Sequence, residues 1–156
     1  MKKILWLLII VSLCLGGCIT MPDNTETPKT YQGDTSEYYN KDFKMEIDNT
    51  TVDIDWEDNT SVKELIEYAK KGLTITMHQY GGFEQVGAIG KTITSNDTQM
   101  ATNPGDVVLY SSNQIVIFFG SNNWNYTKLG HINLSKSELK NLLNKDSVTL
   151  KLQEKN

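Results

Sequence analysis

Apolar and polar residues alternate from about residue 42 to residue 152, which predicts one compact domain built mainly of short β-strands. Residues 43–47 alternate in this way, and the alternation resumes at residues 52–56 after a polar turn, as expected for a hairpin. The almost continuous apolar run at residues 115–119 indicates a strand that is covered on both faces, or one whose outer face meets another element. Strands are also predicted at residues 73–77, 107–110, 114–119 and 148–152.

Two segments instead have the periodicity of amphipathic helices. After Ser61, apolar residues recur at intervals of three and four, Ser61 and Glu64 have the spacing of a capping box, and Gly72 ends the pattern. Residues 135–145 repeat the capping-box spacing with Ser135 and Glu138. Many short strands with two short helices predict a closed or nearly closed β-barrel with helices over its openings.

The N-terminal residues 1–17 have the plan of an export signal, with two lysines, an apolar run and two glycines. The apolar run is too short for a comfortable transmembrane helix. Leu-Gly-Gly-Cys at residues 15–18 resembles the bacterial lipobox, in which a cysteine after small residues accepts diacylglycerol. The resemblance implies that residues 1–17 are removed and that lipid on Cys18 anchors the chain to a membrane. An ordinary or uncleaved signal is the alternative.

Residues 18–41 comprise this cysteine and a polar segment with two prolines, which predicts a disordered tether in front of a domain at residues 42–156. With the signal removed, 13 lysines oppose 19 acidic residues, a formal net charge of −6. This charge argues against nucleic acid as a partner, since nucleic acid requires clustered basic residues. No disulfide is expected, because Cys14 leaves with the signal and Cys18 carries lipid.

Several blocks of sequence resemble the bacterial cyclophilin-like domain family: EDNTSVKEL, YGGFEQVGAIG, PGDVVLY, QIVIFFG and NWNYTKLGHI. The resemblance covers nearly all of residues 45–152 and implies a mainly β fold, a closed eight-stranded barrel of the cyclophilin type with two short helices. Cyclophilins that isomerise prolyl peptide bonds use an arginine, whose planar fork of donors lysine cannot reproduce. The chain has no arginine, so we expect no isomerase activity and no catalytic residue of that kind.

The stretch QYGGFEQVG at residues 79–87 is the first candidate for a site. Its two glycines permit positive φ angles and a tight bend, which would hold Tyr80, Phe83 and Glu84 around one concave spot. The alternative is a barrel corner whose aromatic rings belong to the core. Glu84 favours a site, since a carboxylate beside an apolar ring is unfavourable in a core unless it is paired.

The second candidate is the segment GSNNWNYTKLGH at residues 120–131, where Trp124 and Tyr126 lie among small polar residues. Rigid aromatic side chains among adaptable amides are typical of a recognition loop, and His131 follows them closely. A tryptophan that covers a barrel end is the alternative.

Metal and cofactor sites are not expected. Four acidic residues between 53 and 64 fit some positions of a calcium loop, but Asp58 stands where the loop needs glycine. His78 and His131 are the only histidines, too few for a typical zinc site without free thiols. The chain also lacks a phosphate-binding loop, a dinucleotide fingerprint and a nucleophile elbow.

Together these patterns predict a bacterial lipoprotein anchored on the extracytoplasmic face of the cell membrane through Cys18. We expect a monomer whose cyclophilin-like domain binds a small molecule or an extended peptide. The expected ligand-binding residues are Tyr80, Phe83, Glu84, Trp124, Tyr126 and His131. An enzyme that uses Glu84 and His131, or a structural partner of another envelope protein, is the alternative.

Overall fold

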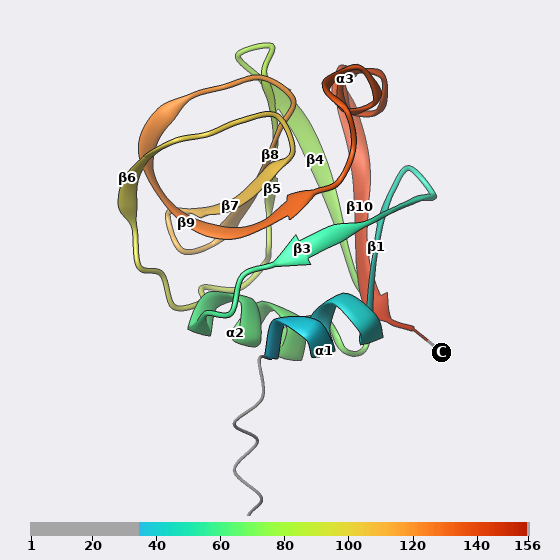
Figure 1. Ribbon diagram of the computed structural model, residues 1–156, viewed down its shortest axis with the longest axis vertical. Helices are drawn as coiled ribbons and strands as arrows, with labels where there is room; N and C mark the ends of the chain where they lie inside the picture. The colour runs from blue at the N-terminus through green and yellow to red at the C-terminus, as the bar shows by residue number, and fades with distance from the viewer. Residues whose placement is uncertain (1–34, 156) are drawn as a thin grey trace, which may run out of the picture. The chain divides into compact units, whose positions relative to one another are not determined.

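The computed structural model describes residues 35–155, which form ten strands and three helices (Figure 1). The predicted signal, the lipobox and Cys18 lie outside the described residues. The strands are β1 (Phe43–Ile47), β2 (Thr50–Val52), β3 (Ile54–Trp56), β4 (Leu73–Tyr80), β5 (Glu84–Ala88), β6 (Thr98–Ala101), β7 (Asp106–Tyr110), β8 (Gln114–Phe118), β9 (Asn123–Ile132) and β10 (Ser147–Glu154). The helices are α1 (Thr35–Asp42), α2 (Thr60–Ala69) and α3 (Lys136–Leu143).

The strands form an almost closed antiparallel barrel, which confirms the predicted fold class. Their order is β2-β1-β10-β4-β5-β8-β7-β9-β3, with β6 paired to β9 outside this path. The predicted hairpin at residues 43–56 is present, but its second arm divides at Asp53 into two strands. Since β2 pairs with β1 and β3 pairs with β9, this bent arm brings the two ends of the path together. Counted as one strand, the bent arm gives a path of eight strands, with β6 in addition.

The barrel interior holds the main hydrophobic core. Alternate residues of β1 are buried, and they pair in register with β10, where Met45 lies opposite Leu152 and Ile47 opposite Leu150. The predicted coverage of residues 115–119 on both faces is also confirmed. Ile115 and Ile117 belong to the main core, whereas Val116 and Phe118 belong to a second buried cluster with Val108 and Tyr126.

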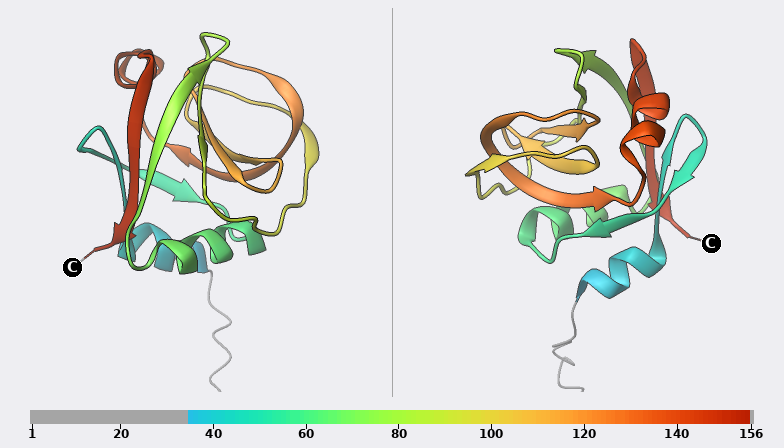
Figure 2. Two further views of the ribbon diagram at one scale, coloured as in Figure 1. Left: turned by 180° about the vertical axis from the view of Figure 1, so that it is seen from behind. Right: turned by 45° about the horizontal axis from the view of Figure 1, so that its top comes forward.

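Helices α2 and α3 lie toward opposite ends of the barrel, as Figures 1 and 2 show. The capping box predicted for α3 is present, with Ser135 as N-cap and Glu138 bonded back to it. The capping box predicted for α2 is wrong, because Asn59 is the N-cap and accepts a hydrogen bond from the Val62 amide. Ser61 and Glu64 instead bond to Thr94, which ties the following loop to the helix.

Helix α1 occupies a segment for which the sequence predicts a disordered tether up to residue 41. The helix packs against β1 and β3, and Tyr39 is buried. The Asn40 side chain accepts a hydrogen bond of 3.0 Å from the Trp56 amide. The burial of Tyr39 and the bond of Asn40 to Trp56 attach the end of the segment to the barrel. The polar composition of the segment does not predict either contact.

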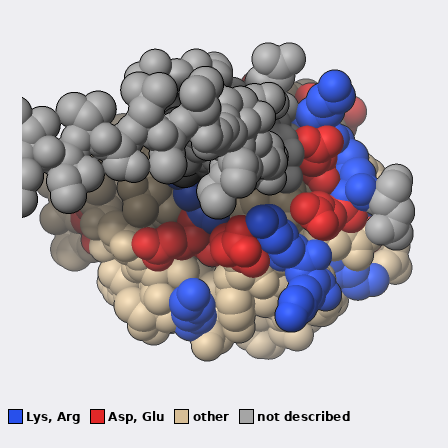
Figure 3. Space-filling view, turned by 90° about the horizontal axis from the view of Figure 1, so that it is seen from below, with Lys and Arg blue, Asp and Glu red and all other residues tan. Residues whose placement is uncertain are grey.

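Charged side chains on the surface are largely interspersed and locally paired. Figure 3 shows lysines beside acidic residues across the lower face of the molecule. The described pairs include Lys44 with Glu46 and Lys145 with Asp48. No described helix is long and apolar enough to cross a membrane.

Candidate functional site

A pocket of about 480 Å³ opens on the face of the sheet opposite the main core. Its walls come from β4, β5, β7, β8 and β9. The lining residues are His78, Gln79, Tyr80, Glu84, Val86, Tyr110, Gln114, Val116, Asn122, Trp124 and Tyr126. The volume lies within the range of pockets that bind small molecules.

Strand register explains why residues distant in sequence meet in this pocket. Tyr80 lies opposite Glu84 across the β4–β5 pair, and His78 lies opposite Val86. Val86 in turn lies opposite Val116 of β8. Since side chains alternate between the two faces of a strand, these residues share one face, whereas Met77 of β4 and Ile117 of β8 point toward the main core.

The stretch QYGGFEQVG both turns the chain and contributes to the pocket. Gly81 and Gly82 form the turn between β4 and β5 with φ angles of 63° and 76°, a conformation that glycine adopts without strain. A side chain at Gly81 would also collide with the Phe83 ring. The turn thereby places Tyr80 and Glu84 as a facing pair at the pocket.

Aromatic rings form much of the pocket wall. The described chain exposes four large hydrophobic side chains, and three of them line this pocket: Tyr80 at 67%, Trp124 at 57% and Tyr110 at 37% exposure. The Tyr126 ring is buried and packs edge-to-face against Tyr110 at 5.9 Å between centroids. Exposed aromatic residues gathered around a concavity are typical of a recognition site.

Among the described residues, Glu84 is the one acidic residue that lines the pocket, and it is 94% buried. Its Oε2 atom is buried and has no hydrogen-bond partner among the described residues. Burial raises the pKa of the Glu84 carboxyl to about 7, because removal from water disfavours the charged form. Near neutral pH the pocket therefore holds a carboxyl that exchanges readily between its acid and its anion.

Tyr126 links this carboxyl to the aromatic wall. Burial, and secondly the nearby negative charge of Glu84, raises the pKa of the Tyr126 hydroxyl. The hydroxyl accepts a hydrogen bond of 3.0 Å from the Asn122 side chain. Because a phenol both accepts and donates, Tyr126 retains its proton as a donor for the pocket.

Four of the six residues expected to bind a ligand come together here: Tyr80, Glu84, Trp124 and Tyr126. Phe83 does not line the pocket; it is partly buried and packs against the second cluster, which includes Tyr126. Its carbonyl accepts hydrogen bonds from the amides of Phe119 and Gly120, which fixes the turn to the end of β8.

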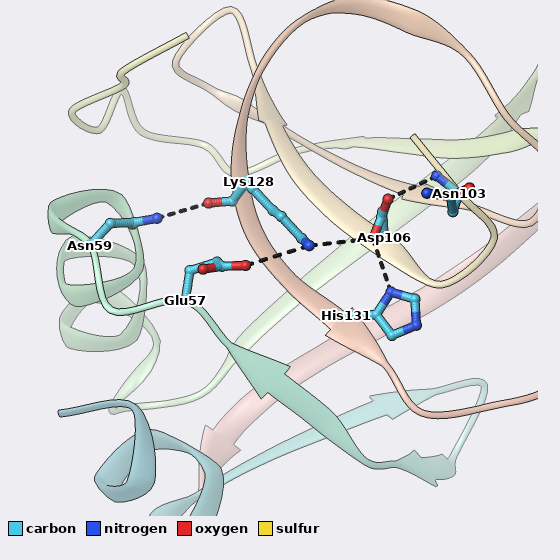
Figure 4. A network of polar contacts seen from close by, with 6 residues as sticks. All are labelled: Glu57, Asn59, Asn103, Asp106, Lys128 and His131. Atoms are coloured by element: carbon cyan, nitrogen blue, oxygen red, sulfur yellow. Dashed lines mark hydrogen bonds and ion pairs between the residues drawn. The ribbon is translucent and has the colours of Figure 1, made fainter. Parts of the chain in front are cut away.

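His131 is not among the residues that line this pocket; its ring faces Asp106 instead (Figure 4). It is seven residues from Trp124 on the same strand, about 20 Å away at the rise of a β-strand. Its Nδ1 atom lies 2.9 Å from Asp106, a buried carboxylate that also accepts from the Asn103 amide and pairs with Lys128. The structure therefore does not bring His131 into the pocket of Glu84, as the alternative of an enzyme that uses both residues requires.

Residues 120–131, expected to form a recognition loop, are largely strand β9. The strand pairs with β3, β6 and β7, which explains its length and its burial. Trp124 and Tyr126 still share a face because they are two residues apart.

Sequence reasoning missed several pocket residues that carry polar groups: His78, Gln79, Tyr110, Gln114 and Asn122. His78 alternates with buried Ile75 and Met77 in β4, a pattern that assigns it to the outer face but gives no sign of a pocket. Tyr110 and Gln114 flank the β7–β8 turn, and only the pairing of that hairpin with β5 brings them near Glu84.

Three of the acidic residues that match positions of a calcium loop, Asp53, Asp55 and Glu64, bond to other side chains or to the backbone. The Asn133 amide donates to both Asp53 and Asp55, while Glu64 accepts from Thr94. Within residues 35–155, no group of three or more His, Cys, Asp or Glu side chains could hold a metal ion.

The barrel and the sequence together define the class of the protein. The model of the cyclophilin-like family matches residues 45–153, a span that contains every pocket residue, so the chain belongs to that family. No curated protein matches the chain. Since one fold hosts many functions, the function has to be argued from the pocket.

Proposed function

We propose that this protein is a binding domain that recognises a small molecule or a segment of an extended peptide in the aromatic pocket. The observation that carries the proposal is Glu84, a buried carboxyl with an unpartnered oxygen in a pocket lined by exposed aromatic rings. An unsatisfied buried polar group costs roughly 1–3 kcal/mol. Beside an open pocket, a bound ligand can supply the missing partner of such a group.

The shape and composition of the pocket support the same proposal. Its volume of about 480 Å³ suits a drug-sized molecule or two to three residues of a peptide. Tyr80 and Trp124 offer apolar area at small entropic cost, while Gln114 and Asn122 offer amide donors and acceptors. The exposed aromatic residues surround a concavity instead of forming a flat patch, which disfavours a purely structural interface.

A ligand screen followed by ¹H–¹⁵N NMR tests this proposal, with Trp124→Ala and Tyr68→Ala as the matched variants. Tyr68 is 40% exposed but does not line the pocket, so its loss serves as the control. We expect ligands whose binding weakens at least tenfold in Trp124→Ala and stays unchanged in Tyr68→Ala. Ligands that bind equally well to both variants would place recognition elsewhere.

We propose further that the domain does not catalyse prolyl isomerisation. The chain contains no arginine, and no lysine within residues 35–155 lines the pocket. The expected cis/trans rate of a proline peptide is therefore the same with and without the protein. A rate enhancement that disappears in Glu84→Gln would contradict this part of the proposal.

The location is proposed from the sequence of the N-terminal segment. We infer that lipid on Cys18 holds the domain on the extracytoplasmic face of a bacterial membrane. Metabolic labelling with a fatty acid should mark the wild-type chain and leave Cys18→Ser unlabelled. Equal labelling of the two proteins would disprove the anchor.

A second candidate function is general acid–base catalysis, and one observation favours it. His78 shares the pocket with Glu84, whose pKa of about 7 suits proton transfer at neutral pH. In this candidate His78 takes the role that the sequence-based alternative of an enzyme gives to His131. Turnover of a pocket ligand that is lost in both His78→Gln and Glu84→Gln would support an enzyme, and binding without turnover would support the binding domain.

A further inference from the structure

We infer that the pocket recognises a primary ammonium group, held by the Glu84 carboxylate and surrounded by aromatic rings. This inference rests on the proposed binding function and specifies the chemistry of its ligand. It depends on three features of the described residues: the unpartnered carboxylate, the ring arrangement and the lack of a competing lysine in the pocket lining.

The carboxylate defines which group it can receive. An ionised carboxylate only accepts hydrogen bonds, so its partner has to be a donor. An ammonium group supplies three donors and a charge, and its bonds to carboxylates are about twice as strong as neutral ones. Glu84 lines the pocket and no described group donates to its buried Oε2 atom, so an ammonium bound at this carboxylate would supply the donor and the positive charge that the fold does not.

The rings around the carboxyl favour a cation as well. Tyr80, Tyr110, Trp124 and Tyr126 all line the pocket, and the face of an aromatic ring attracts a cation within about 6 Å. The same rings offer apolar contact for the carbon atoms that carry the ammonium group. An anionic ligand would meet these ring faces and the Glu84 charge unfavourably.

No resident cation occupies this position. Several surface lysines, such as Lys44 and Lys145, pair with other carboxylates, and among the described residues neither lysine nor arginine lines the pocket. The titratable groups that face Glu84 are His78 and Tyr80 from β4, Tyr110 from β7 and Tyr126 from β9. The lining residues from β8 are Gln114 and Val116, which do not titrate.

Binding of an ammonium group should release a proton. Burial holds the pKa of Glu84 at about 7 in the empty pocket, whereas the ammonium requires the ionised form. Ammonium affinity should therefore rise about tenfold from pH 6 to pH 8, the change in the ionised fraction of such a group. A ligand that presents a carbonyl oxygen to the protonated carboxyl would show the opposite trend.

The experiment compares phenethylamine with 2-phenylethanol, which has a similar shape but carries a hydroxyl in place of the ammonium. Binding to the full-length chain in neutral detergent is measured by NMR titration at pH 6, 7 and 8. At pH 8 we expect phenethylamine to bind at least tenfold more tightly than 2-phenylethanol. The affinity for phenethylamine should also rise from pH 6 to pH 8. In Glu84→Gln the preference for phenethylamine over 2-phenylethanol should fall to about twofold. Tyr68→Ala should bind both probes with the affinity of the wild type.

A second arm distinguishes a free amine from an amine on a peptide. A short peptide with blocked ends and one lysine is compared with the same peptide after acetylation of that lysine. Tighter binding of the lysine peptide than of phenethylamine assigns the ammonium to a peptide. Tighter binding of phenethylamine than of the lysine peptide assigns the ammonium group to a free amine. Both results support the inference of an ammonium ligand.

Two results would overturn the inference in different ways. If 2-phenylethanol binds as tightly as phenethylamine and both require Trp124, the ammonium inference fails while the binding function survives. If Trp124→Ala alters the binding of neither probe, the pocket is not the site and the proposed function fails with it.

Discussion

Two buried carboxyl groups on this barrel have opposite environments. Asp106 is 4% exposed and accepts from the Asn103 amide and the His131 ring, with Lys128 nearby (Figure 4). Glu84 is 6% exposed, and its Oε2 atom has no partner. The two groups are equally removed from water, yet only Asp106 has its charge compensated by the fold.

This difference separates a structural charge from one that is available to a ligand. Asp106 begins β7 and is joined to β9 through His131, so its partners hold two neighbouring strands of the barrel together. Glu84 begins β5 at the edge of an open pocket, where no element of the described chain supplies a donor. Burial alone therefore does not identify a functional carboxyl; burial without a partner beside a cavity does.

The largest expected effect is the loss of stability on removal of the Asp106 carboxylate. Asp106→Ala leaves the Asn103 amide and His131 without their acceptor, so the free energy of unfolding should fall by about 3 kcal/mol. Urea denaturation measures the change, with the exposed Asp146→Ala as a control expected within about 0.5 kcal/mol. If Asp106→Ala lowered the free energy of unfolding by less than 1 kcal/mol, Asp106 would not be a structural charge, and its proposed difference from Glu84 would be wrong.

Replacement of the Glu84 carboxyl should raise the free energy of unfolding, whereas replacement of the Asp106 carboxylate lowers it. The pKa of Glu84 is raised in the folded state, so between about pH 4.5 and pH 7 the folded protein binds more protons than the unfolded chain. Wild-type stability contributed by this group is present at low pH and is lost as pH rises through 7. At pH 8 the wild type carries the cost of an ionised, buried carboxyl, and Glu84→Gln does not. The variant should therefore be more stable than the wild type by about 2 kcal/mol, a value reduced from the full pKa difference because the pocket is open to solvent.

Urea denaturation at pH 5 and pH 8 measures this effect. The difference between Glu84→Gln and the wild type should grow with pH, whereas the exposed Glu154→Gln should follow the wild type. A difference that is the same at both pH values would mean that Glu84 titrates normally.

Phe83→Ala should cost about 2 kcal/mol of unfolding free energy. The ring is only partly buried in the second cluster, so the loss should lie below the 3–5 kcal/mol typical of a core phenylalanine. Tyr80→Ala, three residues earlier in the same turn, is the control and should cost less than about 1 kcal/mol because Tyr80 is 67% exposed. Equal losses would show that Tyr80 also packs as part of the core.

Trp124→Ala should have the smallest effect on stability, within about 0.5 kcal/mol, because the ring is 57% exposed. Thermal denaturation measures it alongside the binding titrations. A large loss of stability would indicate that the tryptophan covers the barrel, as the alternative interpretation of residues 120–131 holds.

The sequence predicts the barrel well because its strands follow the alternation of period two, and Met45 and Ile47 face the core as expected. Helix α1 and strand β6 were not predicted, since both are polar segments that are held by tertiary contacts. Asn40 bonds to Trp56, and Thr98 pairs with Tyr126, across distances in sequence that local patterns do not reveal.

The candidate site was predicted in part for a similar reason. Glu84 and Trp124 stand out locally, as a carboxylate beside a turn and as a tryptophan among amides. His78 and Tyr110 join them only through strand register, which depends on the complete sheet order. Proximity along β9 also suggested His131, whereas the length of the strand carries that residue to Asp106.

The most direct test is the titration of Glu84 itself. Carbon-13 NMR of the glutamate side-chain carboxyls follows each group with pH, and Glu84→Gln identifies the relevant signal. We expect a midpoint near pH 7 for Glu84 in the ligand-free protein. A midpoint near the ordinary glutamate value of about 4.3 would show a solvated or paired carboxyl and would contradict the proposed site.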